Sequence, residues 1–215
     1  MHFYLSDLMI DIVQNSAEAG ADLMEISIDD GFDCTGGRRF FCFSVKDNGI
    51  GMNEEEIKEA GNPFFTKGDK HPHRRVGLGL PFLIQTVNAS GGEWEIKSPL
   101  AFAALGETSA LCETVCEFEK GFEKRIEKGL EIWASFNMNE PDTPPIGDIP
   151  GMIRTAFLFE GPREIIVRRK GKFNYEVRKS DLDYISMDNY LRSLEIEDGE
   201  IQKKDSKKRS MEWQK

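Results

Sequence analysis

The sequence predicts an α/β fold, with a small α/β extension at its C-terminal end. Two observations predict this fold. Apolar residues recur at helical spacing in the segments 5–19 and 77–89, and short aromatic or β-branched segments typical of strands lie between and after them. A chain of 215 residues is long enough to bury a core around such a sheet.

The first forty-six residues predict one helix followed by two strands. Segment 5–19 is an amphipathic helix that stops at Gly20, because its apolar side chains fall on one helical face. Segment 22–29 alternates loosely and predicts a strand, and 40–46 is aromatic and β-branched, which predicts a second strand. The glycine-rich segment 31–39 between them predicts a turn.

Two further helices are predicted before residue 90. Asn53 precedes three glutamates, a combination typical of a helix N-terminus, and this short helix should end near Gly61. The helix at 77–89 should begin close to Leu78–Leu80, because Pro81 is tolerated only in a first helical turn.

Strands are predicted again at 93–97, 109–119 and 129–138. The stretch 99–128 is longer than a usual turn and predicts a variable hairpin. The segment 140–150 contains four prolines and predicts a connector.

Beyond the connector, residues 151–199 predict a small C-terminal extension. It should hold a hairpin around Lys170–Lys172 and a closing helix within 181–195. Residues 200–215 are strongly charged and predict a flexible tail.

Composition excludes several classes of protein. Lys and Arg number 28 and Asp and Glu 38, and the resulting net charge of −10 disfavours a general nucleic-acid binder. No apolar run is long enough for a transmembrane helix, and the acidic residues within the apolar N-terminus argue against a signal peptide. A cytoplasmic protein is expected. The four cysteines predict idle or buried thiols, with a zinc site at the last two as the alternative: Cys34, Cys42, Cys112 and Cys116.

The hexapeptide from Asp47 to Met52, Asp-Asn-Gly-Ile-Gly-Met, directly follows a predicted strand. A carboxylate at a strand end can accept a hydrogen bond from an exocyclic amine, and the glycines at 49 and 51 let the backbone approach a flat ring or a phosphate. The alternative is a tight Asn–Gly turn without a ligand.

A second motif, Gly77-Leu78-Gly79-Leu80, opens a predicted helix. Backbone N–H groups at a helix N-terminus can bind phosphate oxygens, although a glycine-rich turn without a ligand fits this short motif equally well. The preceding loop, 62–76, is cationic and without periodicity, and its Lys67, Lys70, Arg74 and Arg75 could neutralise phosphate charge.

A third motif places Asp11 and Asn15 four residues apart on one helix face. An Asn oxygen can hold Mg²⁺, and the Asp one turn earlier could orient or deprotonate an attacking water. The alternative is an ordinary solvated helix surface.

The order of these motifs resembles the GHKL superfamily, which includes gyrase-type and MutL-type ATPases, large heat-shock chaperones and histidine kinases. The stretch DIVQNSAEAGADLMEISI is similar to the MutL and gyrase form of the Asn motif. The stretch NPFFTKGDKHPHRRVGLGLPFLIQTVNASGGEWEIKS is similar to the lid and second glycine motif of histidine kinases. The resemblance implies a two-layer α/β sandwich of the Bergerat type, in which a mixed β-sheet carries helices on one face. This ATP-binding domain would span residues 1–139, with a lid at 62–76.

The resemblance also implies roles for individual residues. Asn15 would coordinate the Mg²⁺ that bridges the triphosphate, and Asp47 would bind the adenine amino group. Asp11 stands where gyrase-type members carry a general-base Glu, and its shorter side chain predicts slow hydrolysis, because misplacement by about 1 Å can cost roughly a hundredfold in rate. Phe64 would belong to the lid. The remaining nucleotide-binding residues would be Gly49, Gly51, Met52, Phe65, Thr66, Lys67, Gly77, Leu78 and Gly79.

The function implied is Mg-ATP binding, with slow hydrolysis or phosphoryl transfer in trans to a separate protein. Only four residues precede the first helix, and His71 and His73 lie in the lid rather than on a helix, so no phospho-acceptor histidine is expected in this chain. The expected partners are ATP or ADP and a separate protein, without nucleic acid or membrane insertion. The alternative is a non-catalytic switch or interaction module controlled by nucleotide.

Overall fold

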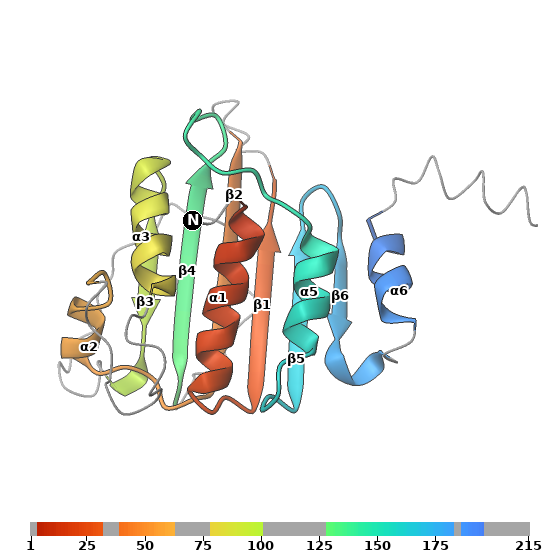
Figure 1. Cartoon of the computed structure of the whole chain (residues 1–215), viewed down its shortest axis with the longest axis horizontal. Helices are drawn as coiled ribbons and strands as arrows, with labels where there is room; N and C mark the ends of the chain where they lie inside the picture. The colour runs from red at the N-terminus through yellow and green to blue at the C-terminus, as the bar shows by residue number, and fades with distance from the viewer. Residues whose placement is uncertain (1–3, 32–38, 63–77, 101–127, 183–185, 196–215) are drawn as a thin grey trace, which may run out of the picture.

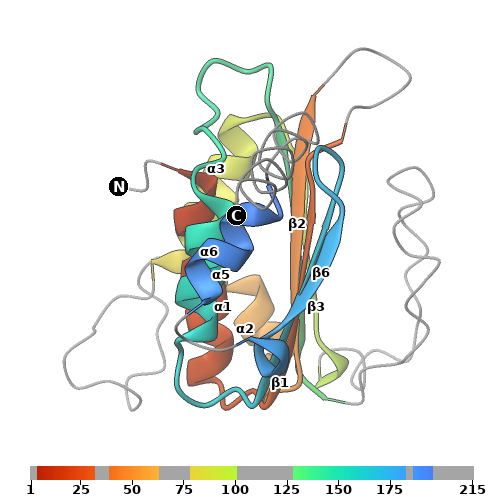
Figure 2. The same ribbon diagram turned by 90° about the vertical axis from the view of Figure 1, so that its right-hand side faces the viewer.

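The computed structural model describes residues 4–31, 39–62, 78–100, 128–182 and 186–195. Its strands form one mixed six-stranded sheet in the order β3-β4-β2-β1-β5-β6 (Figure 1). The helices α1, α3, α5 and α6 all lie on one face of this sheet (Figure 2). The predicted α/β sandwich is therefore confirmed.

The elements have the following bounds. The helices are α1 (Leu5–Glu18), α2 (Glu54–Lys58), α3 (Gly79–Ala89), α5 (Ile149–Phe157) and α6 (Met187–Ser193). The strands are β1 (Leu23–Asp29), β2 (Phe40–Asp47), β3 (Trp94–Lys97), β4 (Leu130–Asn137), β5 (Glu164–Lys170) and β6 (Tyr175–Arg178).

The core lies between the sheet and the helix layer. Helix α1 crosses the middle of the sheet with α3 on one side and α5 on the other (Figure 1). Its buried face is set by the apolar periodicity of the sequence, and burial of these side chains drives the helix onto the sheet. On the strands, alternate residues point into the same core. Fully buried members include Leu8, Met9, Ile12, Ile26, Phe43, Phe136, Phe157 and Val167.

Strand β1 joins the two halves of the chain. It pairs antiparallel with β2 and parallel with β5, so the C-terminal segment extends the same sheet. The predicted hairpin around Lys170–Lys172 is confirmed, since β5 and β6 pair antiparallel on either side of it. Helix α5 packs beside α1 and, together with α6, continues the helix layer.

One boundary differs from the prediction. The connector was expected to reach residue 150, but α5 already begins at Ile149. Asp148 caps this helix by accepting a hydrogen bond from the Gly151 N–H, and Pro150 is tolerated because it lies in the first turn. The predicted strand at 109–119, most of the hairpin at 99–128 and the tail at 200–215 lie outside the described residues.

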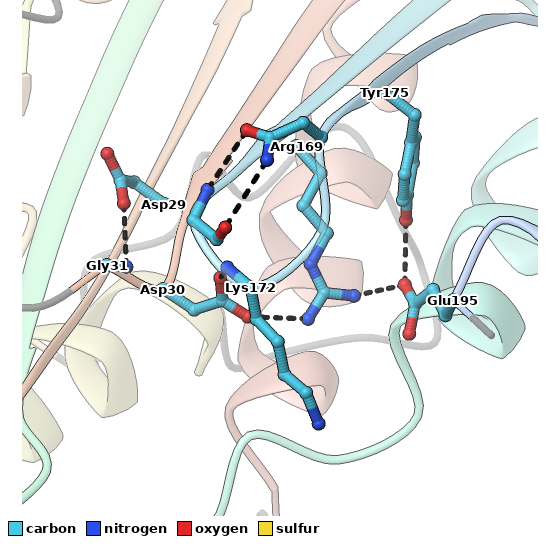
Figure 3. Close-up of polar contacts among 9 residues, drawn as sticks. Asp29, Asp30, Gly31, Arg169, Lys172, Tyr175 and Glu195 are labelled. Atoms are coloured by element: carbon cyan, nitrogen blue, oxygen red, sulfur yellow. Dashed lines mark hydrogen bonds and ion pairs between the residues drawn. The ribbon is translucent and has the colours of Figure 1, made fainter. Parts of the chain in front are cut away.

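A buried ion cluster ties the C-terminal helix to the sheet (Figure 3). Arg169 on β5 has a side-chain exposure of 5% and donates to Asp30 at 2.7 Å through Nη2, and to Glu195 through Nη1. The Tyr175 hydroxyl on β6 donates to the same Glu195 oxygen at 2.7 Å. Glu195 lies two residues after the end of α6. These contacts, which we call the Arg169 cluster, therefore hold that helix against β5 and β6.

Two predictions drawn from the composition, on membrane spans and on cysteines, can be compared with the structure. None of the helices in the described ranges is long and apolar enough to span a bilayer. Cys42 on β2 is buried and in no disulfide with another described residue. The other three cysteines, including the pair considered for zinc, lie outside the described residues.

Candidate functional site

Asp47 is a buried carboxylate at the end of β2. The residue is only 4% exposed. The Ser16 hydroxyl of α1 donates to Asp47 Oδ2 at 2.6 Å, and the Gly49 N–H donates to Oδ1 at 2.8 Å. Burial raises the pKa of Asp47, while hydrogen bonds from Ser16, Gly49 and Leu130 act in the opposite direction. The strand therefore presents an oriented hydrogen-bond acceptor where it meets the C-terminal half of α1.

The turn after Asp47 is bound to the end of α1 and the start of β1. Asn48 Oδ1 accepts hydrogen bonds from the backbone N–H groups of Asp22 and Leu23 at 2.8 and 2.9 Å. A side chain at Gly49 would have its Cβ 3.0 Å from the Ala19 carbonyl oxygen, which shows how closely the turn packs on the helix end. The Asn–Gly turn is therefore part of the architecture around Asp47.

Gly51 occupies a conformation that favours glycine. Its φ is +70°, and a Cβ at this position would lie 2.6 Å from the Gly129 carbonyl oxygen and 2.8 Å from Ser98 Oγ. The buried Ser98 hydroxyl accepts from the Met52 N–H at 3.1 Å and donates to the Gly129 carbonyl at 3.1 Å. These contacts hold the Asp47–Met52 segment against the start of β4.

The third motif meets the second at the contact between α1 and α3. Gly79 is the first residue of α3, and a Cβ there would lie 3.1 Å from Asn15 Nδ2 and 3.3 Å from Asp11 Cβ. Asn15 is exposed and Asp11 is half-buried. The absence of a side chain at 79 thus lets the N-terminus of α3 approach both polar residues of α1.

The N-terminus of α3 can contribute backbone donors to this site. Leu78, its N-cap residue, makes no side-chain capping bond, whereas Asn53 and Asp148 cap α2 and α5. The first N–H groups of a helix have no partner within the helix, and the helix dipole favours negative charge beside them. The region beside Asp11 and Asn15 is therefore suited to an anion.

Part of the predicted site falls outside the described residues. Phe64, Phe65, Thr66, Lys67 and Gly77 are in this group, as is the lid from residue 63 onwards. Among the described site residues, Leu78 is 39% exposed and Met52 is partly buried against the core.

Sequence reasoning missed Ser16, Ser98 and Gly129. Ser16 carries a signal, because it lies four residues after Ile12 on the apolar stripe of α1, where a polar side chain needs a buried partner. Ser98 and Gly129 carry no such signal, since their relation to Asp47 follows from the pairing of β4 with β2.

The oxygen-bearing side chains beside Gly79, those of Asp11 and Asn15, are compatible with Mg²⁺. In the described ranges, no three His, Cys, Asp or Glu side chains are grouped to hold a metal ion. Magnesium keeps several waters and is often bound through one or two protein oxygens plus substrate phosphates. The exposed amide oxygen of Asn15, next to the N-terminus of α3, could supply one such protein oxygen while a phosphate bound there supplies others.

Comparison with known proteins places these motifs in a family context. A sequence model described as "Histidine kinase-, DNA gyrase B-, and HSP90-like ATPase" matches residues 4–137. A 55-residue stretch is 40% identical to sporulation kinase C of Bacillus subtilis (strain 168), and it covers 26% of this chain and 12% of that kinase.

Two solved structures align with most of the chain. The N-terminal domain of a DNA repair protein aligns over 82% of this chain and 52% of its own, with 13% identity and a TM-score of 0.49. The Aquifex aeolicus MutL ATPase domain complexed with ADP aligns over 90% and 70% respectively, with 12% identity and a TM-score of 0.40. The chain thus spans a small part of the kinase and about half of the DNA repair domain.

Proposed function

Because the chain belongs to the family of histidine kinase-, DNA gyrase B- and HSP90-like ATPases, we propose that it binds ATP together with Mg²⁺. The observation that carries this proposal is the arrangement around α1. One end of the helix contacts the buried carboxylate of Asp47 through Ser16, and the same helix presents Asp11 and Asn15 to the first turn of α3. The base acceptor at the end of β2 and the anion-binding N-terminus of α3 therefore both contact α1.

Each group has a definite chemical role in this proposal. Asp47 accepts a hydrogen bond from the exocyclic amine of adenine, and the glycines at 49 and 51 keep the backbone clear of side chains beside the base. The N-terminus of α3 binds phosphate oxygens through backbone N–H groups. Asn15 holds the metal ion, whose charge offsets that of the phosphates.

Asp11 is proposed to act on the attacking group. It lies one turn before Asn15, on the side of α1 that faces Gly79. A carboxylate there can orient a water or take its proton, which gives slow hydrolysis, or it can serve a hydroxyl or imidazole of a separate protein in phosphoryl transfer. For the transfer reaction we propose an acceptor on a separate protein. The three histidines of this chain lie outside the described residues.

Nucleotide binding is tested by thermal unfolding with Mg-ADP and Mg-ATP. At about a hundred times its dissociation constant, a ligand adds roughly 2.7 kcal/mol to the free energy of unfolding, which for a chain of this size raises Tm by about 5–10 °C. We expect this shift in the wild type and its loss in Asp47→Asn, which replaces an acceptor oxygen by a donor.

The matched control is Asp29→Asn. Asp29 ends β1 as Asp47 ends β2, and its Oδ1 likewise accepts from the N–H two residues later, that of Gly31, at 2.8 Å. The antiparallel register of the two strands puts Asp29 at the opposite end of the sheet. This variant should keep the full shift. A folded wild type that responds to neither nucleotide contradicts the proposal, and an unchanged shift in Asp47→Asn contradicts the role of Asp47.

Turnover is tested by phosphate release from Mg-ATP. A positioned general base contributes about 10²–10⁴-fold to rate, and the short side chain of Asp11 forgoes roughly a hundredfold of this. Asp11→Asn should therefore lower the release rate by about tenfold, and by no more than about a hundredfold, while the ADP shift persists. Wild-type protein that binds ATP but forms no ADP, either alone or with candidate acceptor proteins, would instead support the non-catalytic switch.

A further inference from the structure

Ser16 makes a polar contact that none of the motifs explains. Its hydroxyl donates to Asp47 Oδ2 at 2.6 Å, and both residues are only 4% exposed. An O–H donor at 2.5–2.7 Å from a carboxylate oxygen is in the range of strong, charge-assisted hydrogen bonds. Ser16 therefore holds a charged acceptor inside the core rather than filling space on the apolar stripe.

The hydrogen bonds to Asp47 leave room for one more donor. A carboxylate offers about four lone-pair sites on its two oxygens. In the described part of the chain, the Ser16 hydroxyl and the Gly49 N–H donate to it at 2.6 and 2.8 Å. The backbone of Leu130 acts on its pKa in the same direction as these two donors. The three groups belong to α1, the turn after β2 and the start of β4, so among the described residues at least one lone pair stays available to a ligand.

The geometry points to Ser16 as a positioning residue for base recognition. We propose that it fixes the Asp47 carboxylate so that the remaining lone pair meets the exocyclic amine of a 6-aminopurine, and that it thereby sets the preference for such bases. This inference rests on the proposed nucleotide binding and adds a residue that determines its specificity.

The position of Ser16 on α1 links the two halves of the site. Asn15 precedes it and is exposed toward the N-terminus of α3, whereas Ser16 is turned into the core toward β2. Successive helical residues are rotated by about 100°, so one turn of α1 can serve both directions. The hydrogen bond from Ser16 to Asp47 therefore keeps a fixed spacing between the base acceptor and the residues proposed to contact the phosphates.

The test is a two-by-two comparison by titration calorimetry in the presence of Mg²⁺. Wild type and Ser16→Ala are each titrated with ADP and with purine riboside 5′-diphosphate, which lacks the amine at position 6. Hydrogen bonds to charged groups contribute about ten- to a hundredfold in an equilibrium constant. We expect Ser16→Ala to weaken ADP binding by at least about tenfold and to leave the affinity for the analogue within about twofold.

Three further variants separate the hydroxyl from packing. Ser16→Thr keeps the hydroxyl and should retain the preference for ADP, whereas Ser16→Cys keeps the volume with a weak donor and should behave as Ser16→Ala. Ser6→Ala removes another buried hydroxyl from α1 and should change neither affinity. If Ser16→Ala does not fold, Ser16→Cys takes its place in the comparison.

The outcomes distinguish this inference from the proposed function. Equal weakening of both ligands in Ser16→Ala, or restoration of ADP affinity by Cys, would show that Ser16 acts only through packing and would overturn the inference. If Ser16→Ala keeps the wild-type preference for ADP over the analogue, the inference is also overturned. The proposed nucleotide binding would then still stand. Failure of the wild type to bind either ligand overturns the proposed function itself.

Discussion

Burial of Asp47 couples nucleotide affinity to pH in a direction opposite to stability. Its pKa is raised from the ordinary value of 3.8, chiefly by desolvation, so the folded state binds this proton more tightly than the unfolded chain. The contribution of Asp47 to the free energy of unfolding is therefore largest below pH 3.8 and falls as pH rises through the raised pKa. Over the same window the ionised acceptor appears, so affinity for ADP should increase.

Comparison of the wild type with Asp47→Asn measures both effects. Urea unfolding from about pH 4 to about pH 7 should show the wild type losing stability relative to Asp47→Asn as pH rises. ADP affinity of the wild type should rise over the same interval. A difference in unfolding free energy that grows in favour of the wild type with increasing pH would contradict the assigned direction.

Residues of the site differ in how far the sequence reveals them. Asp11 and Asn15 are four apart on a helix, and Asp47 follows a strand, so local spacing places them on their elements. The contact of Gly79 with both α1 residues depends on how two helices pack, and that of Ser98 with Gly129 on how distant strands meet. Such contacts need the folded sheet, because no local periodicity encodes them.

At the scale of elements, the Arg169 cluster determines how firmly α6 is attached. Removing one partner of a buried ion pair leaves the others uncompensated and typically costs about 3–5 kcal/mol. Arg169→Met should therefore lower the free energy of unfolding by about 3 kcal/mol, since it leaves the carboxylates of Asp30 and Glu195 buried without their cation. The measurement is urea unfolding at neutral pH, with proteolysis near residue 195 as a local readout.

Arg192→Met is the matched control for this prediction. Arg192 also contacts two carboxylates, those of Asp148 and Asp188, at 3.1 Å each, but its side chain is 53% exposed. Exposed ion pairs contribute little to stability, so this variant should unfold close to the wild type. Equal destabilisation by the two substitutions would show that burial does not govern the Arg169 cluster.

Elements were predictable where local pattern determines them. The bounds of α1, β2 and β4 follow from apolar periodicity and β-branched content within a residue or two. The start of α5 at Ile149 was obscured because the prolines of the preceding segment indicate a connector, although Asp148 and Pro150 together form a helix start. The parallel pairing of β5 with β1 was not predictable, since it joins segments separated by more than a hundred residues.

At the scale of the whole molecule, the C-terminal segment is part of the same sheet that carries the site. Strand β1 pairs with β5 along its full length, from Leu23 opposite Glu164 to Asp29 opposite Lys170. Helix α5 covers one side of α1, with Ile153 and Phe157 fully buried. The matched family region ends at residue 137, yet α1 and β1 rely on neighbours beyond it.

A chain ending at residue 139 should therefore fail to form a stable fold, although it contains every described residue proposed to contact the nucleotide. Loss of β5 leaves the edge of β1 unpaired, and loss of α5 exposes the apolar side of α1, which together favour aggregation. A chain ending at 195 keeps all described elements and should unfold in one cooperative transition with the same Mg-ADP shift as the full protein. Circular dichroism melts and size-exclusion chromatography of both truncations test this. A monomeric, cooperatively folded 1–139 fragment that still binds ADP would show that the C-terminal strands are dispensable to the site.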